Sequence, residues 1–342
     1  MYYNIFYNLR TSLSTTQLTN YLAYGKISAL FKNEGKMKKI ASSLLMLIAA
    51  AIWGLAFTAQ KASDFIPPFA LGAARSAIAA IFILIIIPVS DKILHTGRHL
   101  MSKATIISLT PDEVVGGVVC GILLTVATFF QQAGMSMGAD AAKASFITAI
   151  YVILVPIYSL VLKKRAPINA WISVFVAAFG FYLLSVKGTF GISGAEITVF
   201  MCSLIFPVHI LAIDRFSKRG DGCRISLVQF ITATGLNALL SAITEKATLA
   251  DFKDCIIPVI YLGVMSSGIA YTLQIVGQKN TPPTASSVIL SLESVFGAVF
   301  GVILLGESLT VREIFGCITV FLAVILSQVT FKKRKLNPKL KT

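Results

Sequence analysis

The stretch TASSVILSLESVFGAVFGVILL, residues 284–305, combines the length of a membrane span with an acidic residue near its middle. As an α-helix, its 22 residues extend over ~33 Å, slightly more than the hydrocarbon core of a bilayer. Lipid gives a carboxylate neither water nor a partner, so we expect Glu293 to face the interior of a helix bundle or a water-filled cavity. Gly297 and Gly301 lie in GxxxG spacing, which lets a second helix approach closely.

The composition of the whole chain extends this interpretation. Of the 342 residues, 56% are apolar and only 13% are charged, which is too apolar for a soluble protein of this size and indicates an integral membrane protein. The net charge of +15 does not indicate a nucleic-acid partner, because the basic residues form short clusters between apolar runs. The five cysteines lack CxxC spacing, so we interpret them as small buried hydrophobic residues, and we expect no metal and no cofactor.

Ten apolar runs reach spanning length and predict an all-α membrane protein with ten transmembrane helices. Strands of a membrane barrel would be shorter and would alternate in polarity. The expected spans are residues 40–60, 68–88, 114–137, 141–162, 168–187, 194–213, 225–244, 255–277, 284–305 and 310–330.

The charges between these spans predict the orientation in the membrane. With the N-terminus inside, 23 Lys and Arg residues fall in inside segments and 6 in outside segments. Since basic residues collect in cytoplasmic loops, both termini are expected to be cytoplasmic, in a cell membrane. Residues 1–37 are interpreted as an N-terminal cytoplasmic extension, of which residues 1–36 are either poorly ordered or a mis-assigned start before Met37, and residues 332–342 as a basic cytoplasmic tail.

A weak internal repeat divides the membrane part into residues 38–188 and 194–331, with five spans in each half. A shift of 142 residues keeps three consecutive spans in register and aligns several identical residues. Because five is odd, the second half must enter the membrane from the opposite face, which gives an inverted 5+5 repeat. Such repeats are typical of secondary transporters, which hold the substrate near the midplane between the halves. The aligned pairs include Gly121 with Gly263, Gln132 with Gln274, Ser145 with Ser287 and Phe179 with Phe321.

Three segments resemble the EamA family of the drug/metabolite transporter superfamily. They are AAAIWGLAFTAQKAS (49–63), the pattern P-x-x-L-x-x-x-R formed by Pro68, Leu71 and Arg75, and LESVFGAVFGVILLGESLT (292–310) with the helix that follows. The resemblance covers about residues 38–330 and implies a ten-helix, two-repeat carrier that exports amino acids or other small metabolites. The chain departs from the family at two places. It has Ser294 after the glutamate, where the family often has proline, and in the first repeat it has Lys163, Lys164 and Arg165 where LGE would be usual.

Two charged residues within spans are candidates for substrate binding or coupling. Glu293 is interpreted either as a proton site or as an acceptor in a salt bridge or serine cage that fixes helix packing. Arg75, seven residues into the second span, is interpreted as a substrate or gating contact, or as a side chain that snorkels or pairs structurally. The sequence leaves open whether the two meet.

Polar and aromatic residues in other spans are the remaining candidates. Amides with adjacent aromatic rings suit a metabolite cavity, and they suit contacts between helices equally well. His209, beside Pro207, is either a proton carrier or a packed polar contact. Pro156 and Pro207 are expected to kink or break their helices at corresponding depths. The further candidates are Gln131, Gln132 and Gln274 with Phe129 and Tyr271, together with Trp53 and Tyr151.

These features favour a secondary-active transporter that moves a small-molecule metabolite by alternating access, with a homodimer left open. One alternative is an intramembrane lipid-modifying enzyme, which would need a paired nucleophile and base, whereas Glu293 is the only acid near the middle of an expected span. The other is a non-transporting membrane scaffold or sensor, which would be expected to carry a soluble domain. The motif typical of ATP hydrolysis, GxxxxGK[ST], and the metallohydrolase motif HExxH do not occur.

Overall fold

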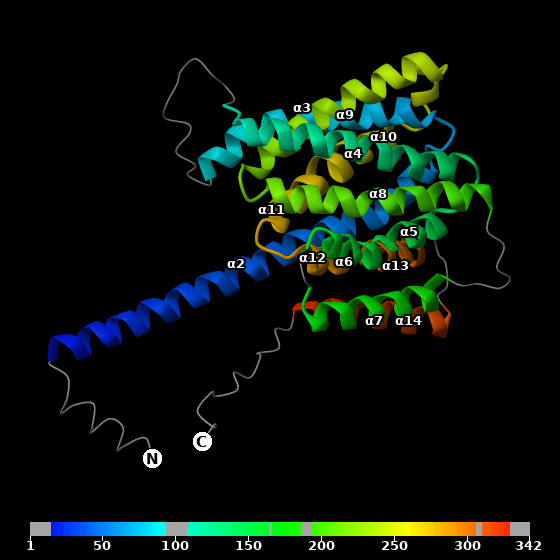
Figure 1. The fold of residues 1–342 in the computed structure, drawn as a ribbon. Helices are drawn as coiled ribbons and strands as arrows, with labels where there is room; N and C mark the ends of the chain where they lie inside the picture. Colours follow the sequence, from blue (N-terminus) through cyan, green and yellow to red (C-terminus); the bar gives the residue numbers. More distant parts are fainter. Residues whose placement is uncertain (1–14, 94–107, 164–165, 186–192, 306–309, 329–342) are drawn as a thin grey trace.

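A computed structural model describes residues 15–93, 108–163, 166–185, 193–305 and 310–328. Throughout these residues the regular structure is helical (Figure 1). Nine segments are long and apolar enough to cross a membrane, and Ile168–Leu183 forms a shorter apolar helix. The prediction of an all-α membrane fold with ten apolar helices is therefore confirmed for the described part of the chain.

The first repeat contributes α2 (Thr15–Lys61), α3 (Pro68–Ile93), α4 (Pro111–Ser136), α5 (Ala141–Ala149), α6 (Tyr151–Val161) and α7 (Ile168–Ser185). The second contributes α8 (Gly194–Phe216), α9 (Gly222–Thr244), α10 (Ile256–Tyr261), the π-helix η3 (Leu262–Tyr271), α11 (Thr272–Gln278), α12 (Pro283–Leu290), α13 (Glu293–Leu305) and α14 (Val311–Gln328). A short helix, η2 (Leu249–Phe252), precedes α10.

The predicted boundaries need two kinds of correction. Helix α2 begins at Thr15, well before the expected start near residue 40, and its first part projects beyond the other helices (Figure 1). The spans expected at 141–162 and 284–305 are each two helices in line, α5 with α6 and α12 with α13. The span expected at 255–277 contains the π-helix η3 between α10 and α11. The basic tail and the loop around residues 306–309 lie outside the described residues.

The helix pairs repeat in a pattern that relates the two halves. Helix α4 packs on α8, and its counterpart α11, with η3, packs on α2. Helix α5 contacts α13 while α6 contacts α12, so the two interrupted spans run antiparallel to each other. Helices α3 and α9 pair at one edge of the bundle, and α7 and α14 pair at the other (Figure 1). Equivalent spans that run in opposite directions are what an inverted repeat requires.

Glycine brings α2 and α13 together where the halves meet. A Cβ added to Gly54 would lie 2.6 Å from Phe296 Cβ and 2.8 Å from the Gly297 nitrogen, closer than atoms tolerate. The expected close approach at Gly297 is thus present. The outer faces carry exposed apolar side chains such as Ile85, Phe175 and Phe315, as expected of a surface that faces lipid.

The two prolines do not mark the breaks. Pro156 lies within α6 and Pro207 within α8, and both helices continue past them. The interruptions instead fall at Ile150 and at Ser291 and Leu292. The prolines were expected to kink or break their helices, and neither helix breaks there, because neighbouring backbone groups can accommodate proline within a membrane helix. All five cysteines are free thiols, and three of them are buried: Cys120, Cys202 and Cys255.

Candidate functional site

A cavity of about 30 Å³ lies at the interface between the repeats. This volume holds about two water molecules. Both halves contribute to its wall, and the polar side chains in it come from six different spans. The lining residues are Trp53, Ala56, Phe57, Gln60, Arg75, Gln131, Thr148, Tyr151, Phe206, Ile210, Ser266, Tyr271, Gln274, Leu290 and Glu293.

The two interrupted spans place Tyr151 and Glu293 in this cavity. Tyr151 is the first residue of α6 and Glu293 the first residue of α13, so each begins the second half of its span. The 142-residue offset seen in the sequence relates these same two positions. Both side chains line the cavity, and the Tyr151 hydroxyl lies close enough to the Glu293 carboxylate to interact with it. At equivalent positions of the two repeats, the first repeat therefore carries a phenol and the second a carboxylate.

Glu293 is buried without a cationic partner among the described residues. Only 5% of the residue is exposed, and its Oε1 atom has no hydrogen-bond partner. The N-terminus of α13 favours a negative charge at this position through the helix dipole. The serine cage that the sequence suggested is not what surrounds it, because the nearby serine hydroxyls bond to backbone carbonyls. Ser294 donates to the Ser145 oxygen at 3.0 Å, and Ser291 donates to the Val288 oxygen at 2.9 Å.

Arg75 is buried with two serine partners from the π-helix. Its Nε donates to Ser267 Oγ at 2.9 Å, and its Nη2 donates to Ser266 Oγ at 3.0 Å. No ion pair joins Arg75 to Glu293 or to another acid among the described residues. Within a membrane span an arginine without a carboxylate is unusual, and such residues generally serve function. The sequence did not single out Ser266 and Ser267.

The π-helix also positions the aromatic wall. Trp53 Nε1 donates to the Ser266 carbonyl oxygen at 3.1 Å, and the Trp53 and Tyr271 rings lie 4.7 Å apart. Wider π turns leave a backbone carbonyl free for such a contact, and π segments often occur at functional sites. His209 lies outside the cavity wall, with its ring 6.0 Å from that of Tyr271. Its Nε2 pairs with Gln229 Oε1 at 3.0 Å, while Nδ1 has no partner.

Of the three candidate glutamines, two line the cavity and one does not. Gln274 lines the cavity, and its Oε1 has no partner. Gln132 does not line it, because its Nε2 donates to the Gln60 carbonyl oxygen at 3.3 Å and joins α4 to α2. Its neighbour Gln131 takes the cavity position and donates to Thr148 Oγ1 at 3.1 Å. The Gln60 side chain, which the sequence did not suggest, also lines the cavity with an unpartnered Oε1.

The candidate Phe129 and the basic residue Lys143 lie away from the cavity. Phe129 stacks on Phe69 with 4.2 Å between ring centroids and does not line the cavity. Lys143 pairs with Glu196 at 3.0 Å near the start of α5, and more than half of the lysine side chain is exposed. We therefore assign both to packing at the bundle surface rather than to the site.

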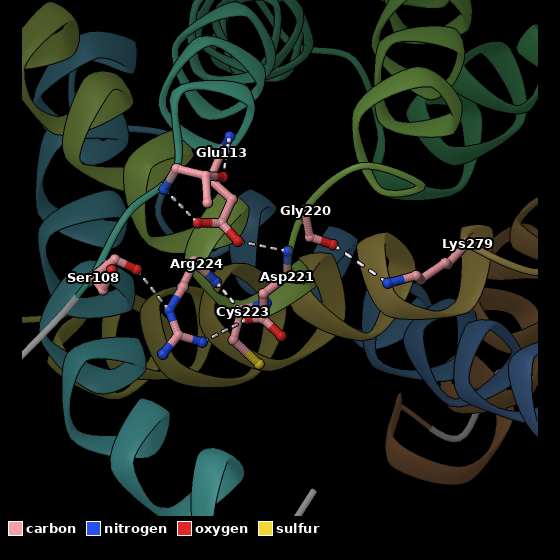
Figure 2. Close-up of polar contacts among 8 residues, drawn as sticks. Ser108, Glu113, Gly220, Asp221, Cys223, Arg224 and Lys279 are labelled. Carbon is pink, nitrogen blue, oxygen red and sulfur yellow. Dashed lines mark hydrogen bonds and ion pairs between the residues drawn. The ribbon is translucent and has the colours of Figure 1, made fainter. Parts of the chain in front are cut away.

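Polar contacts connect the helices at one end of the bundle, where α4 and α9 begin and α11 ends. Glu113 accepts a hydrogen bond from the Asp221 nitrogen at 2.8 Å, and Arg224 Nε donates to the Ser108 oxygen at 3.1 Å (Figure 2). Lys279 Nζ donates to the Gly220 oxygen at 3.4 Å (Figure 2). These contacts tie α4 of the first repeat to the α8–α9 connection of the second, and that connection to the end of α11.

Metal ligation finds no support at the described residues. No group of three His, Cys, Asp or Glu side chains is placed there to hold a metal ion. The histidines at positions 95 and 99, which share i, i+4 spacing, lie outside the described part of the chain.

The chain is similar to known proteins in sequence and in fold. An uncharacterised transporter of Archaeoglobus fulgidus is 28% identical over 323 residues, which cover 93% of this chain and 96% of that protein. An uncharacterised transporter of Clostridium kluyveri is 19% identical over 243 residues, 68% of this chain and 77% of the other. A crystal structure with 17% identity superimposes with a TM-score of 0.65 over 84% of this chain and 96% of that one, which shows the fold.

The EamA-like transporter family matches residues 40–186 and again residues 193–328. The two matches correspond to the two halves that pack as counterparts in the structure. This chain therefore belongs to the EamA-like transporter family and is a multi-pass membrane transporter.

Proposed function

We propose that the protein is a secondary-active transporter that exports a small metabolite with both a carboxylate and an ammonium group, such as an amino acid. The single observation that carries this proposal is the pair of opposite charges in one cavity, neither of which has an ionic partner among the described residues. Arg75 and Glu293 both line the cavity between the repeats.

Electrostatics explains why a ligand with two charges suits this cavity. A buried charge is costly unless it is paired, and pairing needs good geometry because both ions lose their water. The guanidinium has five N–H donors, of which Ser266 and Ser267 occupy two, so it can still bind a carboxylate through its planar fork. Glu293 offers an unpartnered Oε1 to an ammonium. A ligand with both groups satisfies both residues at once.

Amide and aromatic groups complete the proposed site. The unpartnered Oε1 atoms of Gln60 and Gln274 can accept further N–H bonds from the ligand. The rings of Trp53 and Tyr271 would pack against its apolar part. Metabolite sites usually combine such an apolar wall with a few polar groups that fix orientation.

Alternating access is supported by the small size of the cavity and by the interrupted spans. A space of about 30 Å³ cannot hold an amino acid, so the helices must separate for binding. The breaks at Ile150 and at Ser291 and Leu292 divide two antiparallel spans beside the cavity, where half-helices can move relative to each other. We propose that the end connected by the polar contacts of Figure 2 is cytoplasmic, as the loop charges predict, and opens to admit the substrate.

Coupling is assigned to Glu293. A carboxylate buried beside Tyr151, with no fixed cation, can exchange a proton with whichever side the cavity faces. Entry of a proton from outside would neutralise Glu293 and release an ammonium bound there. Export of substrate would then accompany import of a proton.

The transporter proposal is favoured over an intramembrane enzyme by the cavity wall itself. The wall holds one carboxylate and no histidine or cysteine, so it offers neither a Ser–His or Cys–His pair nor a pair of acids. The proposal includes no catalytic step.

Counterflow in proteoliposomes tests the proposal. We expect radiolabelled amino acids to exchange across the membrane, whereas the matching amines and carboxylic acids, each lacking one charge, should compete poorly. Glu293→Gln should abolish the response to a pH gradient, and Lys143→Gln serves as the matched charge control at the bundle surface. Equal competition by singly charged analogues would refute the assignment of Arg75 and Glu293 as the two ligand contacts.

A further inference from the structure

We propose that a groove between α2, α12 and α14 is a binding site for an anionic phospholipid, with an acyl chain along its apolar wall and the phosphate at Lys39. The groove encloses about 570 Å³, which is within the range of sites for small molecules. It is formed by α2 from the first repeat and by α12 and α14 from the second. The proposal concerns this surface alone and does not depend on the substrate of the central cavity.

The groove has the depth of one lipid leaflet. Along α2 its wall extends from Lys39 to Leu47, about 12 Å of helix. Half of a hydrocarbon core is about 15 Å. The far wall is apolar, with Ile289, Phe321 and Val324, and Leu44 and Phe321 are each more than half exposed. Inside a bilayer such a surface is covered by hydrocarbon rather than water, so an acyl chain fits it.

The polar groups of the groove gather at one end, where α14 ends and the apolar part of α2 begins. Lys39 Nζ donates to the Gln328 oxygen at 3.4 Å, and Ser43 Oγ donates to Gln328 Oε1 at 3.3 Å. An ammonium has three N–H donors, so Lys39 can bind a phosphate oxygen in addition. No carboxylate among the described residues lies within ion-pair distance of Lys39.

Charge complementarity selects an anionic lipid over a second copy of this chain. Lys38 lies beside Lys39 and is exposed, and the sequence after Gln328 adds four consecutive basic residues at 332–335. Basic clusters at the end of a membrane helix attract anionic lipids. An identical subunit would bring the same positive charge to the groove and would repel it.

Helix α12 separates the lipid groove from the central cavity. Ile289 lines the groove, whereas the next residue, Leu290, lines the cavity. Helix α12 is thus the wall between the two, and it leads to the interruption that precedes Glu293. An acyl chain in the groove would hold α12 against the cavity, and its loss would free α12 to move outward.

Native mass spectrometry of the full-length protein tests the proposal with phosphatidylglycerol and phosphatidylcholine as probes. We expect the wild type to bind phosphatidylglycerol more tightly. Lys39→Gln should weaken that preference about fivefold, the value for one basic residue near a lipid surface. The matched control is Lys253→Gln, since Lys253 is exposed in the connection before α10.

A second variant separates the groove from general surface charge. Leu44→Trp places a bulky ring at an exposed position of the groove, without removing a core contact, and should displace both lipids while the protein stays monodisperse. Equal binding of the two lipids to wild type and Lys39→Gln would overturn the assignment of the phosphate to Lys39. A dimer that dissociates on Leu44→Trp, without lipid loss, would show that a second copy fills the groove and would overturn the proposal.

Discussion

Replacing Arg75 by alanine should raise the KM for transport on the order of 100-fold. Arg75 holds two bonds to Ser266 and Ser267 and keeps three N–H donors, enough for a two-bond contact with a carboxylate. A hydrogen bond to a charged group contributes about 1.5–3 kcal/mol, so the loss of two costs at least about 3 kcal/mol. Each 1.4 kcal/mol corresponds to about tenfold in affinity, which gives the stated factor.

The assay is counterflow of a labelled amino acid in proteoliposomes, with KM and kcat measured separately. We expect KM to rise with little change in kcat, because the contact is made to bound substrate. Arg75→Lys should lie between wild type and Arg75→Ala, since an ammonium retains the charge but not the planar fork. Ser267→Ala removes one orienting contact and should raise KM about fivefold. An unchanged KM in Arg75→Ala, with the protein folded, would refute the assignment of Arg75 to the substrate.

Three further variants test the coupling site, the packing between the repeats and the polar contacts at the start of α4. Glu293→Gln should raise the KM of counterflow, because the ammonium loses its carboxylate, and should lose acceleration by an inward proton gradient; retained acceleration would exclude Glu293 as the proton site. Gly54→Ala places a Cβ 2.6 Å from Phe296 and should cost about 1–3 kcal/mol of stability, measured as a lower Tm in detergent, whereas Gly235→Ala, with open space around it, should not. Glu113→Gln weakens the charged contact to the Asp221 nitrogen and should lower Tm, while Asp112→Asn, its half-exposed neighbour, should not; equal shifts would contradict this account.

The sequence was sufficient to predict the helices and their grouping into repeats, because hydrophobic length determines what can cross lipid. It did not reveal where the spans are interrupted. Ile150, Ser291 and Leu292 have no strong helix-breaking character, and the interruptions depend on packing between α5 and α13 and between α6 and α12. The prolines at 156 and 207 favoured breaks at those positions, but both lie within continuous helices.

The candidate site was predictable in part for similar reasons. Charge within a span pointed to Arg75 and Glu293, because membranes rarely tolerate such residues without function. Rotation about a helix axis is not predictable to one residue from the sequence, so Gln131 and Gln132 were both candidates, and the structure places Gln131 in the cavity wall. Ser266 was missed because serine is common in membrane helices and a π-helix leaves no clear pattern in the sequence.

The central claim, that the cavity between the repeats opens to each side in turn, is tested most directly by labelling a single cysteine within it. Gln274→Cys, in a variant whose five native cysteines are replaced, places a thiol in the cavity wall. We expect an impermeant maleimide to label it from either face of oriented vesicles, and substrate and a proton gradient to shift labelling from one face to the other. Labelling from a single face under every condition would contradict the account.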